Sequence, residues 1–327
     1  MRRNSSKDWN YHPDLPLEDK SIFFKPLDLL YIFSWLRTNW LTFSERIIVV
    51  IISALAWYFL YPPIHECTDF KITWIFEIWI VNLLLMIVFT GLLHWYFYMA
   101  RGQAKRLKFD HRDLAKNNSN FLFNSQVRDN MFWSLVSGVT FWTFFQVISF
   151  WLFANQYIPT LEVKENYIWF LVLFVLIPIW SALHFYWIHR LLHIPFFYKK
   201  YHSLHHRNIN VGPWSGFSMH PVEHLFYLST ICIHWVVASH PLHLVFHLIY
   251  QSLGAAMSHT GYEELLIKDK KKLALGTFYH QLHHRYFECN YGNQEMPWDR
   301  WFGTFHDGSY ECTEHIRARK RKIFFKN

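Results

Sequence analysis

The chain has 327 residues, of which 52% are hydrophobic and 20% aromatic, and its formal net charge is +8. Such a surplus of apolar residues argues against an ordinary soluble protein and favours a lipid environment. The Lys and Arg residues cluster between apolar segments, where they can face anionic headgroups, so we expect no nucleic-acid partner. The four cysteines show no CxxC spacing, so neither a zinc ribbon nor a disulfide framework is indicated.

Four stretches are long and apolar enough to cross a bilayer, which takes about 20 residues. They run from about Arg46 to Ile64, Thr73 to Met99, Met131 to Ala154 and Tyr167 to Ile188. The polar residues through about Lys20 lack the apolar region of a cleavable signal peptide, so we expect insertion to rely on the internal segments.

A shorter apolar pair follows, from about Leu225 to Ala238 and from His243 to Ser258, with a turn at Ser239-His240-Pro241. We interpret this pair as a helical hairpin that dips into the membrane and returns. A buried pair of core helices, as in a soluble domain, is the alternative.

The loop after the second stretch is strongly basic: it holds Arg101, Lys105, Arg106, Lys108, Arg112 and Lys116. The positive-inside rule places this loop in the cytoplasm. By alternation, the fourth stretch returns to the cytoplasm and delivers His189 there, and the hairpin opens and closes on the same face. We therefore expect an all-α, multi-spanning membrane bundle with a cytoplasmic histidine-rich cap. Its N-terminal cytoplasmic segment would be 1–45, and a single membrane-embedded domain would be 46–327.

Histidine carries the metal-binding signal, and the chain has 22 of them. At this abundance a His-x-x-His-His pattern is expected roughly 0.1 times by chance. It occurs twice, as His202-Ser203-Leu204-His205-His206 and as His280-Gln281-Leu282-His283-His284. Residues three and four apart lie on one face of a helix, so we expect each triplet to converge on an ion.

Further histidines are expected at the same level, where the predicted segments emerge on the cytoplasmic side of the membrane. These are the i, i+4 pair His189 and His193, the pair His220 and His224 where the hairpin starts, and His259 where it returns. One metal takes about four to six ligands, so this many imidazoles predict two metal ions. Imidazole suits Zn, Cu, Fe and Ni alike, but the unactivated C–H bonds of bilayer lipids require a redox-active metal, and we expect iron.

Taken in order, these motifs resemble the fatty acid hydroxylase / sterol desaturase superfamily. The resemblance rests on Tyr186 to His193, both boxes, His220-Pro221-Val222-Glu223, His259-Thr260-Gly261-Tyr262 and Trp298 to Thr304, and covers about 168–310. It implies a non-haem di-iron monooxygenase or desaturase that uses O2 and a cytochrome b5-type or ferredoxin-type electron donor. It also implies the endoplasmic reticulum membrane in a eukaryote, or the inner membrane in a bacterium.

The family's metal ligands carry over onto His189, His193, His202, His205, His206, His259, His280, His283 and His284. Some related hydroxylases place another ligand one helical turn before His259, where this chain has Ala255. His220 or His224 could bind the metal in its place, or could hydrogen-bond to a residue that does. Glu223 could accept the free N–H of a ligating imidazole, or could cap the first turn of the hairpin.

The remaining histidines are expected to pack or to lie on the surface. Those in apolar segments, which we expect to hydrogen-bond within helix interfaces, are His184, His234, His240, His243 and His247. Those without a partner at ligand spacing are His12, His65, His94, His111, His306 and His315.

The predicted function is O2-dependent oxidation of a lipid C–H bond, and no residue type separates hydroxylation from desaturation. The motifs at His259 to Tyr262 and Trp298 to Thr304 look most like the methylsterol oxidase and sterol desaturase branches, so a sterol is the expected substrate. Fatty acyl chains, carotenoid-like lipids and alkylglycerols are alternatives. The chain has no Gly-rich dinucleotide motif, so electrons must come from a partner. The basic tail Arg317 to Lys322 could dock an acidic carrier or contact anionic headgroups.

Two other classes of protein would leave different signatures in the sequence. A zinc-dependent intramembrane hydrolase would show a His-Glu-x-x-His motif, which this sequence lacks. A transition-metal transporter would carry ionisable residues in the middle of several spans, whereas these histidines gather at the cytoplasmic ends of the predicted segments.

Overall fold

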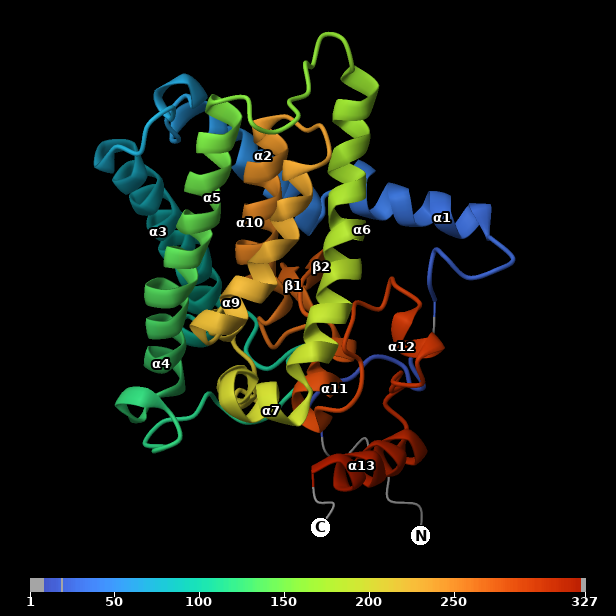
Figure 1. Cartoon of the computed structure of the whole chain (residues 1–327). Coiled ribbons are helices and arrows are strands. Elements are labelled where there is room, and N and C mark those ends of the chain that lie inside the picture. The colour runs from blue at the N-terminus through green and yellow to red at the C-terminus, as the bar shows by residue number, and fades with distance from the viewer. Residues whose placement is uncertain (1–8, 19, 325–327) are drawn as a thin grey trace.

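The computed structural model describes residues 9–18 and 20–324, so residues 1–8 of the expected N-terminal segment and residues 325–327 lie outside it. Helices dominate the described residues, and their two strands form one small antiparallel hairpin (Figure 1). Four helical stretches are long and apolar enough to cross a membrane: Leu29–Phe59, Ile72–Met99, Gln126–Ala154 and Tyr167–Leu192. The predicted multi-spanning helical bundle is confirmed, and the chain is a membrane protein.

In chain order the helices are α1 (Leu29–Leu36), α2 (Glu45–Phe59), α3 (Ile72–His94), α4 (Gln126–Phe132), α5 (Val139–Ala154), α6 (Tyr167–Leu192), α7 (Pro195–Phe197), α8 (Ser203–His206), α9 (Pro221–Leu228), α10 (Pro241–Ser258), α11 (Phe278–Tyr286), α12 (Trp298–Trp301) and α13 (Tyr310–Phe324). Wider π-helical turns extend α1 and α3, join α4 to α5, and join α7 to α8. The strands β1 (Glu264–Ile267) and β2 (Lys270–Ala274) pair with each other.

The first apolar stretch consists of two helical segments that meet at a sharp break. The chain leaves the helical conformation at 42–44, and Ser44 caps α2 by accepting a hydrogen bond from the Ile47 N–H. The preceding helix, α1, lies at a steep angle to α6 (Figure 1). Leu30 and Phe33 of α1 are exposed. The predicted N-terminal segment therefore contains an apolar helix in addition to its polar residues.

The second arm of the predicted hairpin, α10, lies in the centre of the bundle. Of its 18 residues, 15 are buried, and it packs against α2, α3, α5 and α6. The first arm is shorter than predicted as an α-helix, because α9 continues as a 3₁₀ turn over Ser229–Trp235. At the tip, the Leu161 N–H donates to the Ser239 carbonyl at 3.2 Å. The hairpin therefore reaches the loop that joins α5 to α6, at the far end of the bundle.

Histidines inside the hairpin make local hydrogen bonds, as predicted. His247 Nε2 lies 2.8 Å from Ser181 Oγ, and His247 Nδ1 lies 3.0 Å from His234 Nε2. The His243 Nε2–H donates to the Phe170 carbonyl at 2.9 Å. These pairings satisfy buried polar groups where no bulk water reaches.

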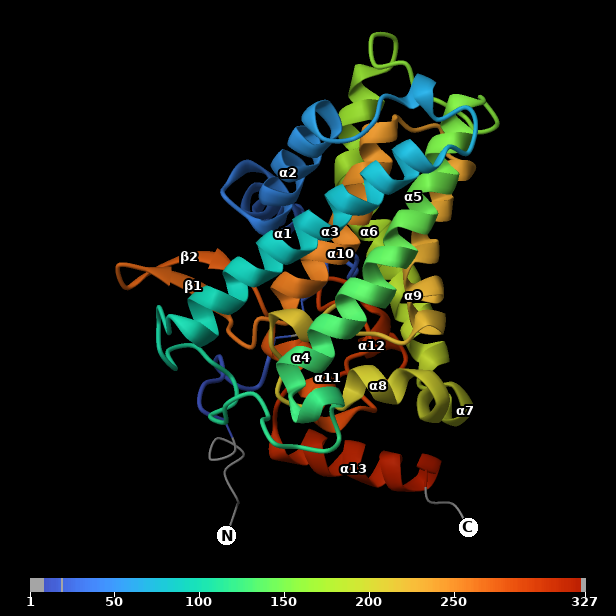
Figure 2. The ribbon, with the colours of Figure 1, turned by 90° about the vertical axis from the view of Figure 1, so that its left-hand side faces the viewer.

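The basic loop between α3 and α4 lies at the opposite end from the hairpin tip. The Phe109 N–H donates to the Gly261 carbonyl at 3.0 Å, and Lys108 pairs with Tyr262 as an isolated bridge. α11 and α13 occupy this same end of the molecule (Figure 2). The basic loop and the return of the hairpin therefore lie side by side.

We expect Asn82→Ala in α3 to lower the free energy of unfolding by about 1–2 kcal/mol, because it strands buried polar partners. Asn82 accepts from the Tyr61 hydroxyl at 2.6 Å and donates to Thr143 Oγ1 and Gln146 Oε1 at 3.1 and 3.2 Å. Thermal unfolding in detergent measures the effect. Leu84→Ala, at a side chain 53% exposed, is the control, and equal midpoints for the two variants would contradict the expectation.

Candidate metal centre

Nine histidines converge at the end of the bundle that holds the basic loop, and they fall into two groups. The first group consists of His189, His193, His202, His206 and His283, and the second group of His205, His259, His280 and His284. Within each group, one nitrogen from each ring lies within 4.8 Å of the others. These nine are the residues onto which the family's ligands carry over, and either group could hold a metal ion.

Each His-x-x-His-His box contributes to both groups, which differs from the expectation that a triplet converges on one ion. In the first box His205 alone joins the second group, and in the second box His283 alone joins the first group. The reason is helix geometry. Residues i and i+4 point about 40° apart, whereas residue i+3 points about 100° away from i+4. The two boxes thus interlock, each supplying a pair to one group and a single imidazole to the other.

Backbone carbonyls fix the tautomer of several of these imidazoles. In three of them the Nδ1–H donates to a carbonyl oxygen at 2.6–2.9 Å: His189 to Tyr291, His283 to Cys289 and His259 to Ala255. A carbonyl oxygen can only accept a hydrogen bond, so each of these Nδ1 atoms carries the proton. Each Nε2 then presents a lone pair to the interior of its group, which is the form that binds a metal.

Two buried carboxyl groups hold two more imidazoles of the first group. Glu223 Oε1 lies 2.7 Å from His202 Nδ1, and Glu288 Oε1 lies 3.3 Å from His193 Nδ1. The Tyr291 hydroxyl donates to Glu288 Oε2 at 2.6 Å. Glu223 could either contact a ligating imidazole or cap the first turn of the hairpin, and the structure shows its contact with the candidate ligand His202. Glu288 was missed because a single Glu in a loop carries no spacing signal.

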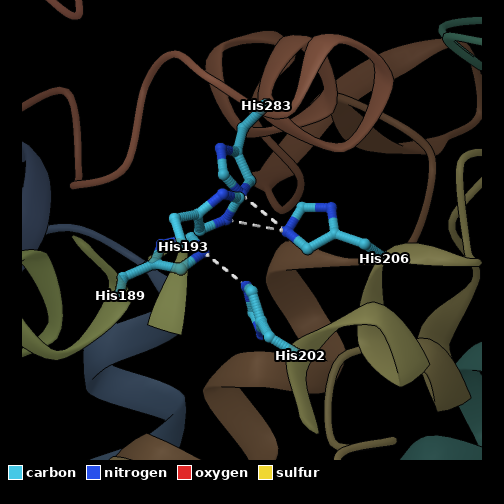
Figure 3. Close-up of side chains that lie close together, drawn as sticks. All are labelled: His189, His193, His202, His206 and His283. Atoms are coloured by element: carbon cyan, nitrogen blue, oxygen red, sulfur yellow. Dashed lines mark hydrogen bonds between the residues drawn. The ribbon is translucent and has the colours of Figure 1, made fainter. Parts of the chain in front are cut away.

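The facing Nε2 atoms fit a metal ion. His189 Nε2 lies 3.1 Å from His202 Nε2, and His259 Nε2 lies 3.0 Å from His280 Nε2 and 3.1 Å from His284 Nε2. His189 and His259 carry their ring protons on Nδ1, so each presents an Nε2 lone pair toward its neighbour, where it can bind a cation. Two nitrogens bound at right angles and about 2.1 Å from one ion lie about 3.0 Å apart. Figure 3 shows the rings of the first group pointing toward one another.

Burial keeps these groups neutral in the absence of a metal. It lowers the pKa of His202 to about 3 and that of His205 to about 4, because a charged imidazolium loses its hydration here. The same loss of water raises the pKa of the Glu223 carboxyl to about 8. A divalent cation would bind the neutral imidazoles and would favour the ionised form of Glu223.

His220 and His224 belong to neither group. His220 Nδ1 accepts a hydrogen bond from the Val222 N–H and so caps α9. The ring nitrogens of His224 lie 3.0 Å from Ser137 Oγ and 3.2 Å from the Phe217 carbonyl. Neither side chain is at the position of a direct ligand.

A cavity of about 490 Å³ opens onto both groups. Its lining includes His189, His202, His205, His259 and His280. Apolar residues of α6, among them Ala182, Phe185 and Ile188, and one face of α10 also line it. Several charged residues, including Arg46 and Glu295, complete the lining. A cavity of this size suits a small-molecule ligand.

Residues 170–304 match the family described as Fatty acid hydroxylase. This region contains all nine histidines of the two groups, and the predicted resemblance is confirmed. A Delta(7)-sterol 5(6)-desaturase of Gibberella zeae is 32% identical over 140 residues, which are 42% of each chain. The Delta(7)-sterol 5(6)-desaturase of Eremothecium gossypii is 33% identical over 142 residues, 42% of this chain and 39% of that one. That of Saccharomyces cerevisiae is 33% identical over 120 residues, 36% and 31% of the two chains.

The match thus spans about two fifths or less of the length of these curated relatives. No solved structure shows a significant match.

We expect Glu223→Ala to weaken metal retention by the first group about 10- to 100-fold, which is the usual effect of removing the carboxylate that holds a ligating histidine. Metal retention is measured as the chelator concentration that removes half of the bound metal. Glu223→Gln keeps an oxygen that can accept from His202 Nδ1 and should fall between the wild type and Glu223→Ala. Metal retention equal in all three proteins would show that the contact does not support binding.

We expect His220→Ala to keep the full metal content, because its ring caps α9, and His284→Ala to lose metal from the second group. Loss of the cap should cost only about 1 kcal/mol of stability. Elemental analysis of the purified variants measures the contrast. Metal loss in His220→Ala as large as in His284→Ala would place His220 among the ligands.

Proposed function

We propose that this chain oxidises a C–H bond of a membrane lipid, by hydroxylation or desaturation, with O2 at two iron ions. The observation that carries the proposal is the joint placement of the two histidine groups and the cavity. Nine imidazoles with at least three fixed lone pairs form two groups inside a membrane bundle, and members of both groups line one largely apolar cavity. An ordinary structural zinc site needs only four ligands and no such cavity.

Bound iron would supply the O2 and redox chemistry that side chains lack. Hydroxylation places one oxygen atom in the C–H bond, while the other leaves as water with two electrons and two protons from a donor. Desaturation removes two hydrogen atoms from the lipid, and with the same two electrons and two protons both oxygen atoms leave as water. The chain's own part is to hold the ligands, exclude water and aim the substrate. Glu223 and Glu288 fix the rings of His202 and His193 for this purpose.

A sterol is the proposed substrate. The relatives named above are Delta(7)-sterol 5(6)-desaturases. Fatty acyl chains and alkylglycerols are the alternatives within the same chemistry. The comparisons give no support for a transition-metal transporter, and the nine histidines gather at one end of the bundle rather than along a path through it.

The active end is proposed to face the cytoplasm, from the endoplasmic reticulum membrane in a eukaryote or the inner membrane in a bacterium. The support is the basic loop, which pairs with the return of the hairpin through Lys108 and Tyr262. We keep the division of the chain into an N-terminal segment, 1–45, and a membrane-embedded catalytic domain, 46–327, as part of the proposal.

Electrons are proposed to come from a cytochrome b5-type or ferredoxin-type donor that docks near α13. Lys320 of this helix lies 3.7 Å from the centroid of the Phe287 ring, and that ring lies 5.0 Å from the ring of His206. The basic helix therefore covers the outer side of the first group. A carrier with an acidic surface could bind this basic helix, and it would then lie close to the metal of the first group. Anionic headgroups, the alternative partner of the helix, need no such closeness to the metal.

Elemental analysis of protein from iron-replete cells, paired with lipid profiling, tests this function. We expect about two irons per chain and a new hydroxylated or unsaturated lipid, with the product lost in His283→Ala and His284→Ala. His65→Ala, at an exposed loop residue, is the matched control and should keep both. Stoichiometric zinc with an unchanged lipid profile would overturn the oxygenase.

A further inference from the structure

We propose that α1 forms a wall between the cavity and the bilayer. Its inner face, through Tyr31 and Trp35, contacts the lipid substrate and helps to select it, and its outer face contacts lipid acyl chains. The inference rests on the proposed function, because it concerns which residues recognise that substrate.

The lining of the cavity comes from two separate parts of the chain. Most of the lining lies within residues 170–304, the segment that matches the family. The other lining residues that the structure describes all lie between positions 18 and 46: they are Glu18, Lys20, Tyr31, Trp35, Glu45 and Arg46. Lys20 pairs with Glu18, and Arg46 pairs with Glu295. Tyr31 and Trp35 therefore supply the rings of this N-terminal part that can pack against a lipid.

The two rings lie on one face of α1, and exposed apolar side chains lie on the other. Tyr31 and Trp35 are four residues apart, as are Leu29 and Phe33. The two pairs are offset by two residues, which turns one pair about 160° around the helix from the other. Trp35 is 7% exposed, whereas Leu29 and Phe33 are 74% and 62% exposed. α1 thus has an inner face toward the cavity and an apolar outer face away from it.

The outer face of α1 is suited to lipid. Apart from its π-helical extension, Arg37–Leu41, α1 packs extensively against no other described helix or strand. With that extension it is about 20 Å long at most, less than the roughly 30 Å of a hydrocarbon core, so it does not span the bilayer by itself. The next helix, α2, exposes Leu55 and Phe59 in the same candidate span. The apolar surface of α1 therefore adjoins a lipid-facing surface, and acyl chains are its proposed partner.

Trp35 ties the inner face of α1 to the rest of the cavity wall. Its ring centroid lies 4.8 Å from Cζ of Arg46, which also lines the cavity. The Trp35 carbonyl accepts from Asn39 Nδ2 at 2.9 Å, and the Asn39 carbonyl accepts from Ser44 Oγ at 2.6 Å. These bonds join the end of α1 to the start of α2 across the break. A lipid that fills the cavity would contact the ring of Trp35 and the histidines, because both line this one cavity.

Sterol binding to the intact, iron-loaded protein in lipid nanodiscs tests the inner face, by competition with radiolabelled Delta(7)-sterol. We expect Trp35→Ala to weaken binding about 10-fold, because the sterol loses contact with an aromatic ring. Trp35→Phe, which keeps a ring, should lie between this variant and the wild type. The space left in Trp35→Ala should also shift the ratio of affinities several-fold toward a bulkier sterol with two additional methyl groups on its first ring.

Trp95→Ala is the matched control, because it removes an indole that is 54% exposed and lies outside the described lining. It should keep the wild-type affinity and the wild-type ratio. Iron content is measured in every variant, since α1 holds none of the nine histidines and changes in it should leave the metal in place. If Trp35→Ala lost its metal through misfolding, Trp35→Phe and Tyr31→Leu would decide the same comparison.

Wild-type affinity and an unchanged ratio in metal-loaded Trp35→Ala would overturn the contact, and oxidation of the sterol by that protein would leave the proposed function standing. A shifted ratio without any oxidised product, in iron-loaded and reduced wild-type protein, would support the contact and overturn the proposed activity. No sterol binding to the wild type would overturn the contact and the sterol assignment together.

A photo-crosslinking amino acid tests the outer face. The full chain carries p-benzoylphenylalanine in place of Phe33 and is irradiated in nanodiscs. We expect mass spectrometry to show an adduct between this position and a lipid acyl chain. A cross-link between two chains would show that a second copy covers the outer face, and it would overturn the bilayer contact, as would the absence of any lipid adduct.

Discussion

The constraint on which the active end depends is the convergence of nine imidazoles in two groups inside the protein. His189 and His259 donate from Nδ1 to backbone carbonyls, so their Nε2 atoms carry lone pairs, and these atoms lie 3.0–3.1 Å from neighbouring Nε2 atoms. Nitrogens at this separation can bind one metal ion together. The loop that supplies the Tyr291 carbonyl and Glu288 also orders the first group, so metal binding and the folding of this end are coupled.

Several polar groups buried in the membrane part of the bundle hydrogen-bond with one another. α10 lies in the centre of this part, where His234 and His247 pair with each other. Asn82 of α3 bonds to Tyr61, just after α2, and to Thr143 of α5. This rigid frame holds two walls of the cavity, one from α6 and one from α10, in a fixed relation to the histidines.

The length and apolar composition of the stretches predicted the spans. Helical periodicity predicted the gathering of the nine histidines, because residues three and four apart lie on one face of a helix. It did not predict the sharing of each box between groups, since that depends on how α8 and α11 face each other. His224 shows the same limit: its i, i+4 spacing to His220 is that of a ligand pair, but its nitrogens contact Ser137 and Phe217. The carbonyl acceptors at Tyr291, Cys289 and Ala255 carry no residue-type signal at all, because every residue has a backbone carbonyl.

Anomalous scattering at the iron absorption edge, from crystals of protein produced in iron-replete cells, tests the central claim most directly. The account predicts two separate peaks in each chain, one surrounded by the Nε2 atoms of the first group and one by those of the second. A single peak, or histidine rings turned so that their nitrogens hydrogen-bond to one another with no ion present, would contradict it.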